Sequence, residues 1–219
     1  SFAPLDLCGF KKDGFYFYQS QWSNKPMVHI FPHWNLEGHE GEKVTVYAYT
    51  NGDEVELFQD GKSLGKQKNN IEGVEYQTWD VIYSPGELKA VSYKADKLHA
   101  EKIIKTASEA TNIEIFSRKK TMQANGQDLI YVEFTLKDKD GNMVPKAASL
   151  LEFSIEGPAT IVGVGNGNNR SHESFQANKR KAFNGKCLAI LKSTKGAGKI
   201  TLTVSGEGLA SNKIVLKSI

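Results

Sequence analysis

Three glycines stand within five positions of the stretch GVGNGNNRSHESFQ, residues 163–176, directly after the strand-like run 159–162. A dinucleotide-binding loop has Gly-x-Gly-x-x-Gly between a strand and a helix, and its third glycine lets the helix pack on the sheet. In the two possible frames, Asn168 and Arg170 occupy the place of that third glycine, and no Gly-Lys-Ser/Thr follows. The sequence therefore does not predict a nucleotide site, and we interpret the glycines as a sharp bend.

Three histidines invite a metal hypothesis, because His29, His33 and His39 lie within eleven residues of one another. Alternation in MVHIF places His29 on one face of a strand, whereas His33 and His39 follow Pro32 and Gly38 into turns. Ligands in that arrangement do not converge on one ion. We therefore expect neither a metal site nor a cofactor.

A nucleophilic site is not indicated either. Ser171, His172 and Glu173 are neighbours in sequence, and an extended chain points successive side chains to opposite sides, whereas a catalytic triad must converge. Cys187 alternates with Leu188 in a core-like strand and is expected to be a small buried hydrophobe. Cys8 is the only other cysteine, and we expect both to be reduced.

Aromatic side chains supply the remaining candidate chemistry, because a tryptophan ring can stack on the apolar face of a sugar. The candidates are Trp34, Trp79, Tyr47 and Tyr49. Trp79 sits in the middle of a strand, which favours a core position. Trp34, in the turn-like PHWN, is predicted to contact either a sugar or another domain.

The composition indicates a folded globular chain. Of 219 residues, 39% are hydrophobic and 24% charged, and the formal net charge is only +3. This balance gives no strong field for nucleic acid, so we predict no nucleic-acid partner. No run approaches the roughly 20 apolar residues of a membrane helix, so we predict no membrane span.

The candidate residues above are positioned by short segments in which apolar and polar residues alternate. From about residue 27 the chain reads as strands and turns: KVTVYAY (43–49) places Val44, Val46 and Ala48 on one face and two tyrosines on the other. The pairs Asn51-Gly52 and Asp60-Gly61 are turn signals, the second for a type I′ hairpin. Further strands are expected at 76–83 and 87–93. This spacing predicts a small antiparallel sandwich.

The pattern then restarts after a small, polar linker at 105–112, which places a domain boundary near residues 108–111. We predict a second sandwich with strands in the segments 112–116, 128–138, 149–157, 159–165, 186–193, 199–206 and 211–219. By contrast, the aromatic-rich segment before residue 23 has no sheet pattern. We expect it to pack on a partner surface that lies outside this sequence.

Three long motifs in this sequence resemble those of a known enzyme family. DLCGFKKDGFYFYQSQW (6–22) and HIFPHWNLEGHEGEKVTVYAYTNGDEVELFQDGKSLGK (29–66) resemble the end of the catalytic barrel and the following sandwich of glycoside hydrolase family 2 enzymes of the β-galactosidase type. GVGNGNNRSHESFQANKRKAFNGKCLAIL (163–191) resembles the final immunoglobulin-like domain that many bacterial members append. The resemblance covers essentially the whole chain, and the motifs occur in the family's order.

The resemblance implies an all-β fold of two tandem immunoglobulin-like antiparallel β-sandwiches, preceded by a short helical remnant of a TIM barrel. The implied domains are a barrel remnant at 1–24 and sandwiches at 25–108 and 109–219. Catalytic carboxylates of the family lie on earlier barrel strands. No residue here matches their motifs, so no catalytic residue is predicted, and the glycine stretch becomes a loop in which Asn166 and Asn168 suit left-handed conformations.

The leading hypothesis is thus a non-catalytic C-terminal portion of a glycosidase whose partner is the parent enzyme's own catalytic barrel. The alternatives are a carbohydrate-binding module, with an oligosaccharide as partner, and a stand-alone adhesin-like pair of domains. The predicted carbohydrate or interdomain contacts are Trp34, Asn166, Asn168 and Arg170. The resemblance favours a periplasmic or extracellular location over a cytoplasmic one, and the sequence leaves the oligomeric state and the parent's substrate open.

Overall fold

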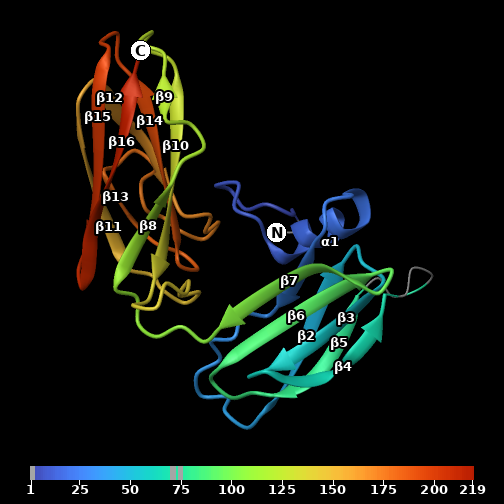
Figure 1. Ribbon diagram of the computed structural model, residues 1–219. Coiled ribbons are helices and arrows are strands. Elements are labelled where there is room, and N and C mark those ends of the chain that lie inside the picture. The colour runs from blue at the N-terminus through green and yellow to red at the C-terminus, as the bar shows by residue number, and fades with distance from the viewer. Residues whose placement is uncertain (1–2, 70–72, 74–75) are drawn as a thin grey trace. The chain divides into compact units, whose positions relative to one another are not determined.

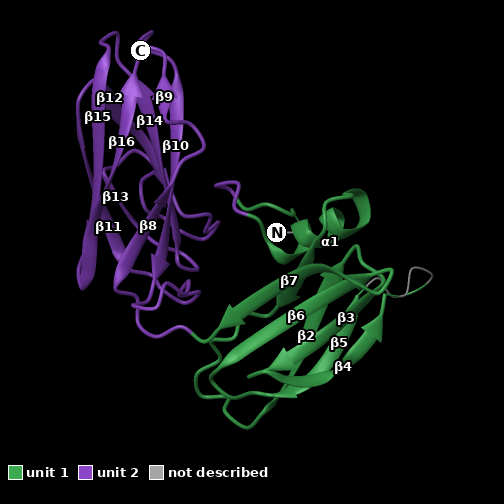
Figure 2. Cartoon of the chain, in the orientation of Figure 1, with its two compact units in different colours: residues 1–6, 11–106 green, residues 7–10, 107–219 purple. Residues whose placement is uncertain are grey.

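A computed structural model describes residues 3–69, 73 and 76–219, and the predicted first domain and first sandwich therefore each include a few residues outside the described part of the chain. In the described residues, every regular element except one short helix is a β-strand (Figure 1), which confirms the all-β prediction. It divides into two compact units, shown in Figure 2. Unit 1 comprises residues 1–6 and 11–106, and unit 2 comprises residues 7–10 and 107–219.

The helix α1 (Asp13–Trp22) lies in unit 1. Asp13 places a negative charge in the first turn, where it interacts favourably with the helix dipole. The helix ends at Ser23, whose backbone is extended, and the amide of Ser23 still bonds the carbonyl of Gln19 at 3.1 Å. Pro26, which cannot continue a helix, follows three residues later.

Two antiparallel sheets form the rest of unit 1. One has the order β1 (Val28–Phe31), β2 (Lys43–Thr50) and β5 (Gln77–Ile82); the other has the order β4 (Lys62–Lys68), β3 (Glu54–Gln59), β6 (Glu87–Lys94) and β7 (Lys97–Lys105). One core joins them, because Ile30, Val46 and Val81 from the first sheet cluster with Leu57 and Leu88 from the second.

The turns of unit 1 follow the sequence signals. Asp60 and Gly61 connect β3 to β4 with φ angles of 48° and 79°. Two positive φ angles define a type I′ turn, whose twist matches that of the flanking strands, so this prediction is confirmed. Ala95 and Asp96 join β6 to β7 in the same way, with φ angles of 48° and 60°.

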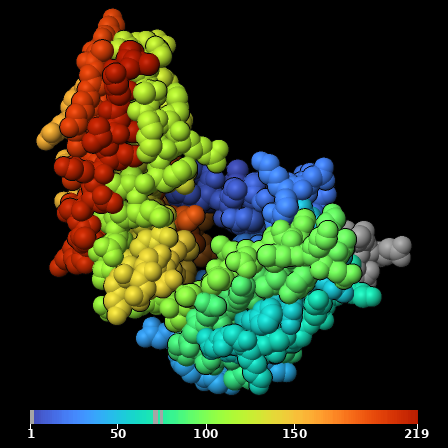
Figure 3. Space-filling model, viewed as in Figure 1, coloured from blue at the N-terminus to red at the C-terminus, as the bar shows by residue number. Residues whose placement is uncertain are grey.

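Unit 2 contains one nine-stranded sheet whose halves enclose a second core. The path runs β12 (Ala159–Gly165), β14 (Lys186–Ser193), β10 (Leu129–Lys137), β8 (Asn112–Phe116), β16 (Leu209–Ser218), β15 (Gly198–Gly206), β11 (Leu150–Glu156) and β13 (Lys179–Lys181), and β9 (Thr121–Met122) pairs with β16. The halves meet through a single parallel pair, Ala210 with Asn112. In Figure 3, β15 and β16 form a continuous red strip on the visible surface of this unit.

Strict alternation builds the core of unit 2. In β10, Ile130, Val132, Phe134 and Leu136 are all fully buried, while the residues between them are not. Side chains of a strand alternate between faces, so one face of β10 packs inward and the other meets solvent. Phe134 contacts Phe153 of β11 from the other half, with ring centroids 4.8 Å apart.

Candidate functional site

The loop between β12 and β13, residues 166–178, is the glycine-rich segment that the sequence singles out. Gly167 has a φ of 77°, which a residue without Cβ adopts without strain. The prediction of left-handed conformations for Asn166 and Asn168 is wrong, because neither has a positive φ. Their side chains instead fold the backbone: Asn166 Oδ1 accepts from the amide of Asn168 at 3.0 Å, and Asn168 Oδ1 accepts from the amide of Arg170 at 2.9 Å. These are Asx turns.

Arg180 of β13 holds this loop from inside unit 2. Its side chain is fully buried. Nη2 donates to Asn166 Oδ1 at 3.1 Å, and Nη1 donates to the carbonyl of Glu173 at 2.8 Å. Only Nε, 3.7 Å from Glu173 Oε2, is too far for a hydrogen bond. A buried guanidinium is costly unless its donors are satisfied, so the loop and Arg180 specify each other's positions.

Glu173 completes this network. Its Oε1 accepts from the amide of Lys181 at 3.1 Å, and its Oε2 accepts from the hydroxyl of Ser171 at 3.1 Å. His172, between these two residues, is exposed. The Ser171 and Glu173 side chains therefore contact each other, and the exposed His172 takes no part in this network.

The sequence did not reveal Arg180. It lies in the run Lys179-Arg180-Lys181. Because all three residues are basic, the run shows no alternation of apolar and polar side chains that would identify the one that points inward. Asn166 is also buried, at 3% exposure, which removes it from contact with a ligand and makes it a structural residue of the loop. Asn168 is half-buried and Arg170 is exposed.

Phe175 presents the largest apolar surface of the loop. Its ring is 57% exposed, and the guanidinium carbon of Arg180 lies 4.9 Å from the ring centroid. A cation over one face of an aromatic ring is attracted by the ring quadrupole and fixes the ring's position.

Trp34 lies in the core of unit 1, with an exposed fraction of 1%. Its indole nitrogen donates to the carbonyl of Ser84 at 3.0 Å, and its ring meets that of Tyr83 edge to face, with centroids 4.9 Å apart. The sequence predicted that Trp34 contacts a sugar or another domain; its burial leaves no ring face accessible to a sugar, and the contacts described here lie within unit 1. Trp79, 6% exposed, is also a core residue.

Acid and base groups lie mostly at the surface. An open depression of about 560 Å³ on unit 2 is lined by Glu152 and Glu207, both exposed, and by Ser149, Leu150, Ser205 and Gly206. Solvent around these carboxylates contrasts with the dry pockets that tune catalytic acids. Within the described residues, no group of three or more His, Cys, Asp or Glu side chains is placed to hold a metal ion.

Besides Arg180, Cys187 and Asp138 are buried ionisable groups of unit 2. Burial raises the pKa of the Cys187 thiol to about 12, which agrees with its predicted role as a buried hydrophobe. Burial alone would also raise the pKa of Asp138, but hydrogen bonds from Asn142, Ser108 and Asp140 together lower it. Asp138 is 1% exposed and accepts the side-chain amide of Asn142 at 3.1 Å. Cys8 and Cys187 are not joined in a disulfide.

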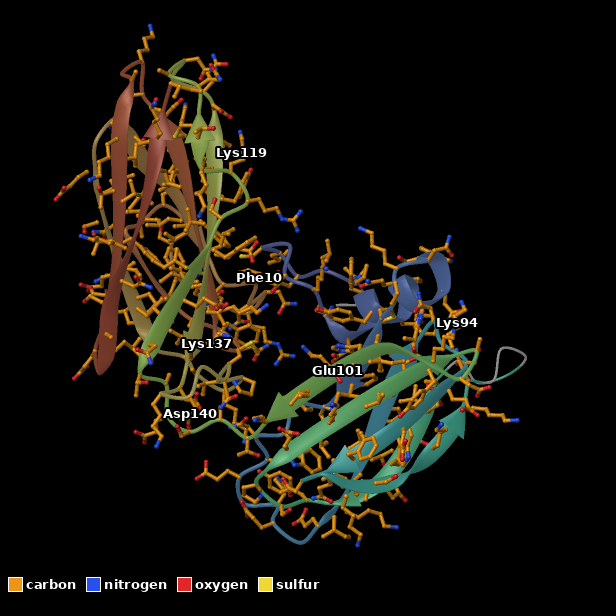
Figure 4. All side chains as sticks on the ribbon, in the orientation of Figure 1. Phe10, Lys94, Glu101, Lys119, Lys137 and Asp140 are labelled. Atoms are coloured by element: carbon orange, nitrogen blue, oxygen red, sulfur yellow. The ribbon has the colours of Figure 1, made fainter. Side chains whose placement is uncertain are left out.

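Some of the surface charges form ion pairs. Lys89 contacts Glu101 at 2.8 Å in unit 1, and Lys119 contacts Asp128 at 2.9 Å in unit 2; Glu101 and Lys119 are labelled in Figure 4. Exposed pairs of this kind contribute little to stability. Among the residues that the structure describes, no helix is both long and apolar enough to cross a bilayer.

Comparisons with known proteins match both units. Residues 113–215 match a family described as glycoside hydrolase family 2 C-terminal domain 5, and residues 41–100 match one described as a domain of unknown function, DUF4982. The β-galactosidase BoGH2A of Bacteroides ovatus is 40% identical over 95% of this chain, which corresponds to 24% of that protein.

Solved structures of glycosidases are also similar to this chain. A β-glycosidase from Bacteroides vulgatus superimposes with a TM-score of 0.94 at 36% identity, over 99% of this chain and 28% of that one. A β-glucuronidase from glycoside hydrolase family 2 superimposes with a TM-score of 0.87 at 26% identity, over 99% of this chain and 22% of that one. The chain thus spans about a quarter of the length of the relatives that it matches.

Proposed function

We propose that this chain, which matches the C-terminal region of glycoside hydrolase family 2 enzymes, is a non-catalytic portion that supports the catalytic barrel of such an enzyme. The proposal rests on how much of each protein is matched. The relatives match nearly the whole of this chain, whereas the chain matches only 24% of one relative and 28% of another. Most of each relative therefore lies outside the matched region.

The architecture supports a scaffolding role. Each unit has its own apolar core, and buried polar groups such as Arg180 and Asp138 are engaged in holding loops. In this proposal residues 25–108 and 109–219, which make up most of unit 1 and unit 2, are immunoglobulin-like sandwiches. Residues 1–24, with α1, are the last helix of the barrel and its approach.

The parent's reaction forms part of the proposal. We infer that it hydrolyses O-glycosidic bonds, because the relatives are named as a β-galactosidase, a β-glycosidase and a β-glucuronidase. Those names differ in the sugar, so a β-galactoside and a β-glucuronide are the first substrates to test. We also propose that the parent enzyme is periplasmic or extracellular.

The test compares the full-length enzyme, the enzyme lacking these 219 residues, and the 219-residue chain alone. Turnover of chromogenic β-galactosides and β-glucuronides is measured together with thermal inactivation. We expect turnover only in the full-length enzyme, or a sharply shortened half-life in the truncated one. Turnover by the chain alone, or a truncated enzyme as active and durable as the full one, would refute the supporting role.

One observation favours a second function, carbohydrate binding by the 166–178 loop. Phe175 offers an exposed ring fixed from behind by Arg180, and Arg170 with Asn168 provides polar groups on the same loop. An apolar ring with adjacent hydrogen-bonding groups is the chemistry that a pyranose requires. We therefore retain Asn168 and Arg170 as candidate contacts and add Phe175.

This second function is tested by titrating the chain with galacto-, gluco- and glucurono-oligosaccharides in a calorimeter. Saturable binding that is lost in Phe175→Ala, and kept in Phe116→Ala, would support it. Phe116 is a matched control because it is 51% exposed and lies on β8. If no heat of binding is detected at millimolar sugar concentrations, the hypothesis of carbohydrate binding is refuted.

A further inference from the structure

The outer face of the three-stranded sheet of unit 1 is unusually aromatic. Val28, Ile30, Val46 and Ala48 of β1 and β2 point into the core, so His29, Phe31, Tyr47 and Tyr49 occupy the opposite face. Tyr76, next to β5, joins them, with its ring centroid 5.7 Å from that of Tyr47. These five residues are called the aromatic face below. Beyond the aromatic face, the same side of the sheet is polar, with Lys43, Thr45, Thr78 and Asp80. A sheet face exposed to water carries polar residues of this kind, so the aromatic part is built for contact with another surface.

Four rings form a stack that begins on α1 and crosses the aromatic face. The centroids of Tyr16 and His29 are 3.8 Å apart with planes at 10°, and those of His29 and Phe31 are 5.8 Å apart at 23°. Phe31 and Tyr47 continue the stack at 5.1 Å and 12°. Because the rings turn their faces toward one another, their edges point outward. A pyranose needs an open ring face, so this geometry disfavours a sugar and favours the apolar side chains of a protein.

Helix α1 already covers part of the aromatic face, so the prediction that the aromatic-rich segment before residue 23 packs on a surface outside this sequence is wrong for this part of the helix. Phe17 meets Tyr49 edge to face at 5.4 Å, and Asp13 bonds His29 Nε2 at 2.8 Å. The same helix presents Tyr18 and Trp22 outward, with centroids 4.8 Å apart and exposed fractions of 42% and 80%. Tyr76 is also 42% exposed. Exposed tyrosine and tryptophan side chains are typical of interface anchors.

We propose that the aromatic face, together with Tyr18 and Trp22 of α1, is the surface on which the catalytic domain of the same polypeptide docks. The inference rests on the proposed function, in which α1 is a barrel helix. If α1 is a barrel helix, the barrel residues next to it lie against the part of the aromatic face that α1 leaves uncovered, beside Tyr47 and Tyr76. The partner surface is apolar and carries few charges, to match the ring edges.

Covalent linkage explains why moderate contacts suffice. The matched region is 24% of one relative and 28% of another, so the remainder is tethered to it in those proteins. A tethered partner is present at an effective concentration in the millimolar range, and docking then needs far less affinity than association of free molecules. A second copy of this chain has no such advantage, which makes it the less favoured occupant.

The experiment introduces a charge at two exposed anchors, Tyr76→Lys and Trp22→Lys, in the full-length enzyme and in the 219-residue chain. Tyr131→Lys is the matched control, because Tyr131 is 53% exposed on β10 of unit 2. We expect all three variants of the chain alone to melt within about 1 °C of wild type, since exposed substitutions change stability little. In the full-length enzyme, the two anchor variants should lower Tm by about 3 °C or more, and the control should not.

The other results overturn the inference in identifiable ways. Equal melting of anchor and control variants in the full-length enzyme would show that the catalytic domain docks elsewhere. A concentration-dependent dimer of the chain, seen by sedimentation and lost in Tyr76→Lys, would assign the face to a second copy. Binding of an oligosaccharide that Tyr76→Lys abolishes would assign it to a sugar. If the truncated enzyme described above is unimpaired, the supporting function itself fails, whatever the anchor variants do.

Discussion

Nη2 of Arg180 donates a hydrogen bond to Oδ1 of Asn166 at 3.1 Å, and both side chains are buried in unit 2. The pair ties the short strand β13 to the start of the glycine-rich loop. The loop that first suggested ligand chemistry is therefore a rigid structural element around a buried cation. Any ligand it binds must use the outward residues that this pair holds in place.

Replacing Arg180 with leucine should destabilise unit 2 by about 3 kcal/mol, because the Asn166 side chain and the Glu173 carbonyl would lose their donor inside the protein. The free energy of unfolding from urea denaturation measures the loss. Arg170→Leu is the control: Arg170 is exposed, and its replacement should cost less than about 0.5 kcal/mol. Similar values for the two variants would contradict the structural role of Arg180.

Trp34→Ala should destabilise unit 1 by about 3–5 kcal/mol, because it empties a core site and leaves the Ser84 carbonyl without its indole donor. Trp34→Phe should cost less, since most of the ring volume remains. Calorimetric melting of both variants tests this order. A Trp34→Ala variant that melts like wild type but loses sugar binding would instead restore Trp34 as a ligand contact.

Acid should weaken unit 2 through Asp138. Its pKa in the folded protein is lowered, so the stabilisation is fully present above the unfolded value of about 3.9 and disappears as the pH falls through the folded pKa. Asp138→Asn should therefore reduce stability at pH 7 and flatten the loss of stability at acidic pH. Urea midpoints from pH 7 to pH 2 test this, and identical pH slopes for the two proteins would contradict it.

Cys187 should resist alkylation in the folded protein. With a pKa of about 12, only about one thiol in ten thousand is ionised at pH 8, and the side chain is fully buried. Iodoacetamide at pH 8 should modify Cys187 only after urea is added, as read by peptide mass spectrometry. Modification of Cys187 within minutes in native buffer would contradict its burial.

Ala95→Gly should stabilise unit 1 by about 0.5–1 kcal/mol. Ala95 has a φ of 48° in the turn between β6 and β7, and a Cβ is strained there. Ala210→Gly in β16 is the control with the opposite expected sign, because glycine weakens a strand. Urea midpoints of both variants are compared with wild type, and destabilisation by Ala95→Gly would refute the argument.

The sequence alone determined the strands and many of their faces. Alternation in 43–49 correctly separates Val46 and Ala48 from Tyr47 and Tyr49, and Asp60-Gly61 forms the expected hairpin turn. These features are local: side-chain direction in a strand repeats every two residues, and a type I′ turn needs only its own two φ angles. Such information is present in any short window of the chain.

Tertiary structure decided which of the remaining residues face inward. Trp34 and Asn166 lie in irregular segments without a period, and Arg180 lies among residues of its own charge, so nothing local marks them as buried. Their positions depend on partners distant in sequence, such as Ser84 for Trp34 and Asn166 for Arg180. The ring stack across α1, β1 and β2 has the same origin, because its geometry exists only after the helix packs on the sheet.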